Sequence, residues 1–297
     1  MKILKERIYP LIHLNCTTDL NCQQCINVPQ SPAILELKSA VFKALYDASY
    51  NDYDFRDMLM KDNNIIPHLT HPLIQFASQS QLDKKSDSQE QHNQQKSEST
   101  SSLSLITQSL DLLERLISNN NKICKVAINT SNALHSLFTL SIYKINIHFN
   151  KEFDLQTFEV RHSSRRCLYN IQYSGDTSVY TELVNANYTG VLFNSFSTAG
   201  GSGEEQDYEV SIGLDNISYF LEFLNKGRNN FATFPPQPLL VRRSVEQIEE
   251  EGGNEEVESL QKYRVDFGHI KINANYAKGA ILNQFIEQGS TRPYWYN

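Results

Sequence analysis

The fold prediction starts from residues 190–196, Gly-Val-Leu-Phe-Asn-Ser-Phe, in which apolar residues recur at or near every second position. Residues 207–212, Asp-Tyr-Glu-Val-Ser-Ile, show the same alternation. A period of two sends alternate side chains to opposite faces, so both segments are predicted to be half-buried strands. The predicted strands are Tyr188–Phe196, Tyr208–Leu214, Tyr219–Leu224, Leu239–Arg243 and Tyr263–Ile272. Residues 145–280 are therefore predicted to form an antiparallel β-sandwich.

Residues 31–142 show the three-to-four-residue spacing that is typical of amphipathic helices. Ser31-Pro32 is a helix start, because Ser is a preferred N-cap and Pro lacks an N–H that the first turn would leave unbonded. The strongest pattern runs from Leu103 to Ile117. Residues 79–102 contain one aliphatic side chain, so they are predicted to be a disordered insertion between two helices.

The predicted fold class is therefore α+β, with a helical module at 31–142 followed by a β-sandwich at 145–280. An N-terminal segment, residues 1–30, precedes the helical module, and a C-terminal tail, residues 281–297, follows the sandwich.

The helical half contains Leu-Leu-Glu-Arg-Leu-Ile-Ser-Asn-Asn-Asn at residues 112–121, then Leu134-x-x-Leu137-Phe138, and earlier Asn64-Ile65-Ile66-Pro67-x-Leu69. These segments resemble parts of armadillo or HEAT repeats. The resemblance implies a helical scaffold that presents a groove to partners.

The second half contains Tyr180–Tyr188 leading to Val191-x-Phe193, then Glu204–Tyr208, Pro236–Val241 and Tyr263–Tyr276. These segments resemble the CUB-like or jelly-roll-like β-sandwich modules that lie beside armadillo or HEAT repeats in very large ubiquitin ligases. No RING, ZZ or HECT pattern accompanies them in the sequence. The resemblance therefore implies a partner-binding piece of such a ligase without its catalytic part.

The N-terminal segment holds the densest group of cysteines, His13-x-x-Cys16 and Cys22-x-x-Cys25. A gap of two residues lets both side chains of a pair point at one ion, and thiolates with imidazole suit tetrahedral zinc. A structural zinc ion held by these four residues is one prediction. The alternative is a cysteine-containing loop packed on the first helix, with no cofactor.

Two further groups of residues allow a functional and a structural interpretation. His68 and His71 could form a metal pair, but no Asp, Glu or Cys lies near them in the sequence, which favours a polar turn. Cys167 follows two arginines that could activate a thiol, but isolated cysteines are usually packing residues, and that interpretation is favoured.

Arg161, Arg165 and Arg166 form a basic cluster that could bind a phosphate or an acidic peptide. The same arginines could instead pair with the acidic run at Glu246–Glu258, which holds seven acids and no base. Removing this run from a net charge of −7 leaves a nearly neutral body. That balance argues against general binding to nucleic acid or to an anionic membrane.

The sequence has neither a secretory signal nor an apolar run near 18 residues, and five cysteines without a signal indicate a reducing compartment. We therefore expect a cytoplasmic or nuclear protein that is not secreted. No nucleophile–base pair or phosphate-binding loop is visible, which argues against an enzyme. The predicted function is a non-enzymatic scaffold that binds a protein partner. The alternative is the non-catalytic, substrate-binding or partner-binding portion of a ubiquitin-ligase system.

Overall fold

The structure, a computed structural model, describes residues 2–16, 20, 22–29, 31–61, 65–83, 100–145, 147–196, 207–262 and 269–282. Over these ranges every regular element is a helix, and β-type pairing is limited to two isolated bridges, Leu14–Ile26 and Arg228–Phe234. The chain divides into two compact units, Met1–Ser174 and Gly175–Asn297. None of the described helices combines the length and apolar character that crossing a bilayer requires.

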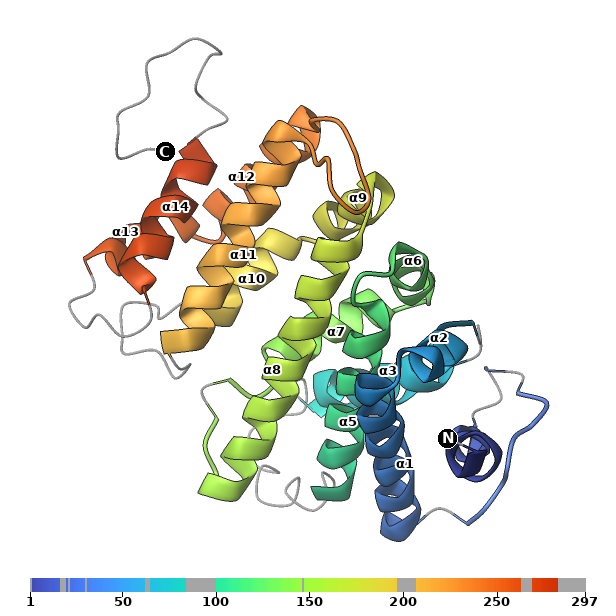
Figure 1. Ribbon diagram of the computed structural model, residues 1–297. Coiled ribbons are helices and arrows are strands. Elements are labelled where there is room, and N and C mark those ends of the chain that lie inside the picture. The colour runs from blue at the N-terminus through green and yellow to red at the C-terminus, as the bar shows by residue number, and fades with distance from the viewer. Residues whose placement is uncertain are drawn as a thin grey trace. The chain divides into compact units, whose positions relative to one another are not determined.

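The first unit is built around α5 (Thr100–Ile117), which packs against α1 (Pro32–Asn51), α3 (Ile65–Asp83) and α8 (Lys151–Ser174) (Figure 1). Its leucines and isoleucines are buried on several sides, as expected for a helix at the centre of a bundle. The remaining elements of this unit are η1 (Leu4–Ile8), η2 (Tyr9–His13), α2 (Tyr53–Lys61), α6 (Asn121–Asn129) and α7 (Ala133–Ser141).

Two sequence signals in this unit are confirmed locally. Pro32 is the first residue of α1, and the amphipathic segment from Leu103 to Ile117 lies within α5. Asn120 then caps α6, because its side-chain oxygen accepts a hydrogen bond from the backbone N–H of Ile123 at 3.1 Å. An N-cap of this kind satisfies a backbone donor that the first turn cannot bond internally.

The second unit is built around α11 (Asp207–Lys226), which packs most extensively on α14 (Ile270–Leu282). Its aromatic core stacks Tyr180 on Phe220, with ring centroids 4.9 Å apart, and Tyr188 meets Phe220 edge-on at 5.1 Å. The other helices of this unit are α9 (Thr177–Asn185), α10 (Tyr188–Phe196), α12 (Pro238–Glu250) and α13 (Gly253–Gln261).

The predicted β-sandwich at residues 145–280 is wrong, and with it the α+β fold class. Tyr188–Phe196 is α10, residues 208–214 and 219–224 lie in α11, and Leu239–Arg243 lies in α12. Of the fifth predicted strand, residues 263–268 lie outside the described residues, whereas Ile270–Ile272 begins α14. The described part of the chain is all-helical.

The physical reason is the length of the segments that suggested strands. A window of six or seven residues cannot separate a period of two from a period of 3.6 when apolar residues are dense. Over its full length α11 buries one helical face at spacings of three and four, formed by Val210, Leu214, Ile217, Leu221 and Leu224.

The resemblance to ubiquitin ligases that combine helical repeats with a CUB-like or jelly-roll-like sandwich is also wrong. The segments that carried the second module contain helices and no strand where the structure describes them. A helix cannot supply the paired edges and two packed sheets that define a sandwich.

The predicted insertion and tail fall largely outside the described residues. Within the insertion, residues 79–83 complete α3 and residues 100–102 begin α5, whereas residues 84–99 are not described. Within the tail, residues 281–282 complete α14, and residues 283–297 are not described.

Candidate metal centre

The N-terminal segment is closed into a loop by backbone pairing on either side of its cysteines. Asn15 N–H donates to the Ile26 carbonyl at 3.0 Å, and Ile26 N–H donates to the His13 carbonyl at 2.8 Å. Asn15 has a positive φ of 45°, a conformation that Asn tolerates better than most residues, and its side chain accepts from Val28 N–H at 2.8 Å. This pairing brings the residues around His13 next to those around Cys25.

His68 comes from the first turns of α3, far from the cysteines in sequence. Ile65, Ile66 and Leu69 are fully buried, so this end of α3 is anchored in the core of the first unit. His68 itself is 4% exposed and His13 is 6% exposed. The two imidazoles meet edge-on, with ring centroids 4.8 Å apart.

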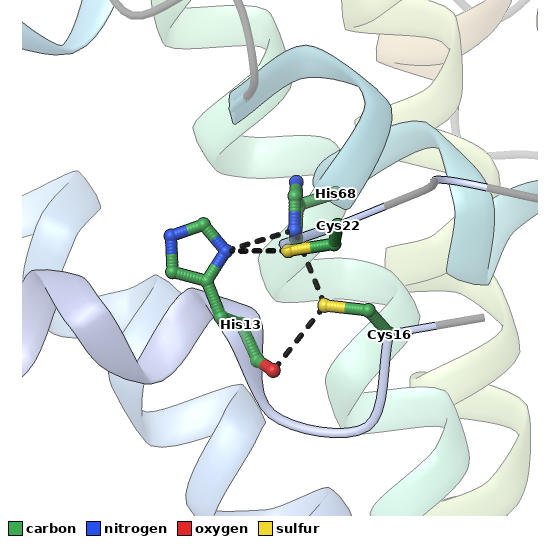
Figure 2. A group of neighbouring side chains, drawn as sticks. All are labelled: His13, Cys16, Cys22 and His68. Carbon is green, nitrogen blue, oxygen red and sulfur yellow. Dashed lines mark hydrogen bonds between the residues drawn. The ribbon is translucent and has the colours of Figure 1, made fainter. Parts of the chain in front are cut away.

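Four side-chain donor atoms converge at this point (Figure 2). His13 Nδ1 lies 3.1 Å from His68 Nε2 and 3.2 Å from Cys22 Sγ, and Cys16 Sγ lies 3.3 Å from His68 Nε2. All four donor atoms are within 4.8 Å of one another. The group of His13, Cys16, Cys22 and His68 could therefore hold a metal ion.

These separations can be compared with a tetrahedral site. Metal–nitrogen distances near 2.0 Å and metal–sulfur distances near 2.3 Å place neighbouring donors about 3.3 to 3.8 Å apart in a tetrahedron. The three separations of 3.1 to 3.3 Å fall at or just below the lower end of this range. The group as a whole spreads over up to 4.8 Å, so an ion would require some of the side chains to move apart and others to move closer.

Burial raises the pKa of the Cys16 thiol to about 12. Desolvation is the largest cause, followed by hydrogen bonds with Cys22 and Cys25 and by the charges of those two groups. In the metal-free protein this thiol is therefore protonated at neutral pH. A metal ion that binds Cys16 must displace that proton, so binding is coupled to proton release.

Lys38 places a positive charge beside the cluster. Its buried ammonium donates to the Leu14 carbonyl at 3.0 Å, which ties α1 to the backbone next to His13. Desolvation lowers the pKa of Lys38, and the nearby Cys16 and Cys25 oppose that shift. The ammonium thus positions the loop, and it would compensate thiolate charge if a metal ion displaced the thiol protons.

Cys25 lies next to the cluster but in a different environment. Its sulfur accepts a hydrogen bond from Cys16 N–H at 3.2 Å and donates to Asn27 Oδ1 at 3.2 Å. Of the four residues predicted as ligands, the structure brings His13, Cys16 and Cys22 together with His68, and leaves Cys25 on the backbone of Cys16.

His68 is the member that the sequence pattern did not join to the cysteines. His68 and His71 were predicted to lie in a polar turn, because no Asp, Glu or Cys is near them in the sequence, but both lie in α3 and His68 is buried. Cys16 precedes His68 by 52 residues and His13 precedes it by 55. The signals available were the loop that contains His13, Cys16, Cys22 and Cys25 and, elsewhere, a histidine at the start of an apolar segment, but nothing in the sequence alone joins the two.

The three arginines that were predicted to bind a ligand make contacts inside the first unit. Arg161 donates to the Tyr143 carbonyl and Arg165 to the Ser141 carbonyl, each at 3.1 Å, and both arginines are buried. Ser141 is the last residue of α7, where a helix leaves carbonyls unbonded, and Tyr143 follows just after the C-cap. Arg166 is the most exposed of the three.

Arg166 pairs with Glu114 of α5, with Nη2 and Oε2 3.1 Å apart. Asn170 also donates to Glu114, at 2.8 Å. Cys167 is fully buried beside them and donates to the Leu110 carbonyl at 3.2 Å. Burial raises its thiol pKa far above the usual value, which fits a packing residue and not an activated nucleophile.

No protein-family model and no curated protein sequence matches the chain. Among solved structures, the chain is similar to a crystal structure of an engineered protein, with 14% identity. That alignment covers 94% of this chain and 99% of the other, with a TM-score of 0.47.

Proposed function

We propose that this protein is a non-catalytic helical module that holds its N-terminal segment in place with one structural zinc ion and acts by binding a protein partner. The observation that supports it is the convergence of His13, Cys16, Cys22 and His68 on one point. Two imidazoles and two thiolates are a donor set that favours zinc in tetrahedral geometry.

The number of protein donors argues for a structural and not a catalytic ion. Catalytic zinc sites keep one position open for water or substrate, whereas structural sites use four protein ligands. Here four donors lie within 4.8 Å of one another, which leaves no position for a substrate in a four-coordinate site. The reaction of a substrate at this ion is therefore not expected.

The stabilising effect of zinc belongs to the N-terminal segment. Within its described residues only Ile12, His13 and Leu14 are buried, so apolar packing alone anchors it weakly. An ion shared with His68 would connect this segment to α3 and close a loop of about fifty residues. Closing a loop of this size lowers the entropy of the unfolded chain.

Partner binding is supported by aromatic and aliphatic side chains exposed on two helices that pack on each other. Tyr208 and Tyr219 of α11 are 62% and 50% exposed, and Ile272 and Tyr276 of α14 are 48% and 55% exposed. Tyrosine is enriched in protein interfaces, since it combines a large apolar ring with a hydroxyl.

The zinc part of the proposal is tested by measuring metal content in the full chain, purified under reducing conditions without a chelator. We expect one zinc per chain, loss of zinc in Cys22→Ser and His68→Ala, and retention in Cys25→Ser. His135→Ala is the matched control, because His135 is an exposed histidine on α7. Less than half an equivalent of zinc in the unsubstituted protein would contradict the proposal.

The partner-binding part is tested by quantitative affinity capture from a native extract, comparing the unsubstituted chain with a Tyr219→Ser, Tyr276→Ser double variant. We expect the unsubstituted chain to retain a protein from the extract. The amount of that protein retained by the double variant should be lower by about tenfold or more, as for interface hot spots. Lys271→Ser is the control on the same helix. Equal capture by all three chains would remove the α11–α14 surface from the proposal.

A further inference from the structure

Three aromatic rings surround the ammonium group of Lys144, in the connection between α7 and α8. The distances from Lys144 Nζ to the ring centroids are 5.7 Å for Tyr143, 5.3 Å for Phe149 and 5.0 Å for Phe153. All three are within the 6 Å range over which a cation is attracted to the face of a ring. We call Tyr143, Phe149 and Phe153 the aromatic cage.

The positions of two cage rings are fixed by the start of α8. Asn150 Oδ1 accepts a hydrogen bond from Phe153 N–H at 2.9 Å, and Asp154 Oδ1 accepts from Phe149 N–H at 3.1 Å. The two phenylalanine rings then meet edge-on, with centroids 5.2 Å apart. The backbone that carries both phenylalanines is thus held by polar side chains at the start of α8.

The third ring is held by the core of the first unit. Tyr143 is 3% exposed, and its ring packs on Phe76 of α3 with centroids 5.2 Å apart. Phe149, in contrast, is 44% exposed. The cage therefore has a rigid inner wall and an outer wall that a ligand can reach.

We propose that the aromatic cage is a binding site for a quaternary or methylated ammonium group, and that Lys144 occupies it when no ligand is bound. A primary ammonium is compact and strongly hydrated, so it loses much of its hydration energy when it enters a cage. A trimethylammonium group is larger and more weakly hydrated, and it keeps its full charge for the rings. Aromatic cages recognise quaternary ammonium groups for this reason.

Lys144 acts here as an internal competitor. A ligand can bind only the fraction of molecules in which the lysine has left, so its apparent dissociation constant is raised by the inverse of that fraction. Removing the lysine side chain should therefore strengthen binding without altering the rings.

This inference goes beyond the proposed function, because the cage belongs to the first unit and not to the α11–α14 surface. It names a class of ligand, a protein that carries a methylated lysine, and it rests on the proposed function only for the protein nature of that ligand. Choline headgroups contain the same chemistry. The net charge of −7, and Asp154 next to Phe153, disfavour the phosphate that accompanies choline. A methylated lysine lacks that phosphate, and its positive charge suits an acidic protein.

The test is a titration of the zinc-loaded full chain, followed by NMR, with four probes. These are a short peptide that contains trimethyl-lysine, the same peptide with unmodified lysine, phosphocholine, and the peptide with an uncharged tert-butyl isostere. We expect saturable binding of the trimethyl-lysine peptide, and affinity about fivefold higher or more for Lys144→Ala, from the energy of an exposed cation–π contact. We expect phosphocholine to bind more weakly, and the other two probes not to saturate.

Two ring variants keep the result interpretable. Phe149→Leu and Phe153→Leu retain apolar packing but remove the π face, and each should weaken binding about fivefold in the Lys144→Ala background. Tyr143 is left unchanged because it is part of the core. Equal affinity for the charged and uncharged probes, or no saturable binding to Lys144→Ala, would overturn the inference. Zinc content and partner capture are measured in separate experiments. A negative result in either of them can therefore be distinguished from a negative result in the titration of the cage.

Discussion

Asp111 illustrates, at the scale of single residues, how burial controls charge in the contact between α5 and α8. Its carboxylate accepts from Ser163 Oγ at 2.7 Å. Desolvation raises the pKa of Asp111, and this effect outweighs the opposing contributions of Ser163, Arg166 and His162. The folded protein therefore binds a proton here more readily than the unfolded chain does.

The sign of the effect on stability follows from linkage. Because the folded-state pKa lies above the ordinary value of 3.8, the folded protein holds more protons in the interval between the two. Asp111 contributes its full stabilisation at pH values below the ordinary pKa. This contribution is lost as the pH rises through the pKa of the folded state.

We expect Asp111→Asn to raise the free energy of unfolding at pH 7, because Asn keeps an acceptor for Ser163 and removes a desolvated charge. The difference from the unsubstituted protein should shrink as the pH falls and be smallest below 3.8. Urea unfolding of both proteins across this pH range measures it. A variant that is less stable at pH 7 would mean that attraction to Arg166 outweighs desolvation.

The residue scale also shows what the sequence could predict of the metal centre and what it could not. The spacing of His13, Cys16 and Cys22 in one short loop was sufficient to predict a cluster. It could not separate Cys25 from the other thiols, because that distinction depends on the bonding of its sulfur to Cys16 N–H. His68 required the packing of α3, which no local pattern contains.

Among the elements, α7 depends on side chains from another helix for its C-terminal end. Arg165 Nε donates to the Ser141 carbonyl at 3.1 Å, and Ser164 Oγ donates to the Leu137 carbonyl at 2.7 Å. Both donors come from α8. The sequence, which contains only a run of basic residues here, could not distinguish this arrangement from a ligand-binding surface.

We expect Arg165→Met to lower the free energy of unfolding by about 2 kcal/mol, because it leaves a buried carbonyl without a donor. Arg166→Met is the matched control. Its guanidinium is half exposed, so loss of its pair with Glu114 should cost less, about 1 kcal/mol. Denaturant unfolding of the two variants measures this difference. Equal, small losses would return Arg165 to the set of candidate binding residues.

The incorrect prediction of strands in residues 145–280 arose from the length over which each element was considered. In α5 the apolar residues extend over eighteen positions, so the helical period was readable. In α11 the same information was present, with Val210, Leu214, Ile217 and Leu221 on one face, but shorter windows around Tyr208 and Tyr219 were read as separate strands.

At the scale of the whole molecule, the candidate metal centre lies in one of the two compact units, Met1–Ser174. Within that unit the centre joins two parts of unequal stability. The start of α3 is anchored by Ile65 and Ile66, which are fully buried, whereas few side chains of the N-terminal segment are buried. Removal of an ion should therefore release the segment and leave the helices folded.

We expect hydrogen exchange of the full chain to measure this difference. A chelator should remove most protection from amides of residues 9–16 and 22–28, reduce it modestly in the first turns of α3, and leave α11 unchanged, because opening is local where few apolar contacts oppose it. His68→Ala should give the same pattern in the presence of zinc. If α1 and α5 lost protection together with the segment, the ion would be holding the whole unit, and its role would be folding and not local attachment.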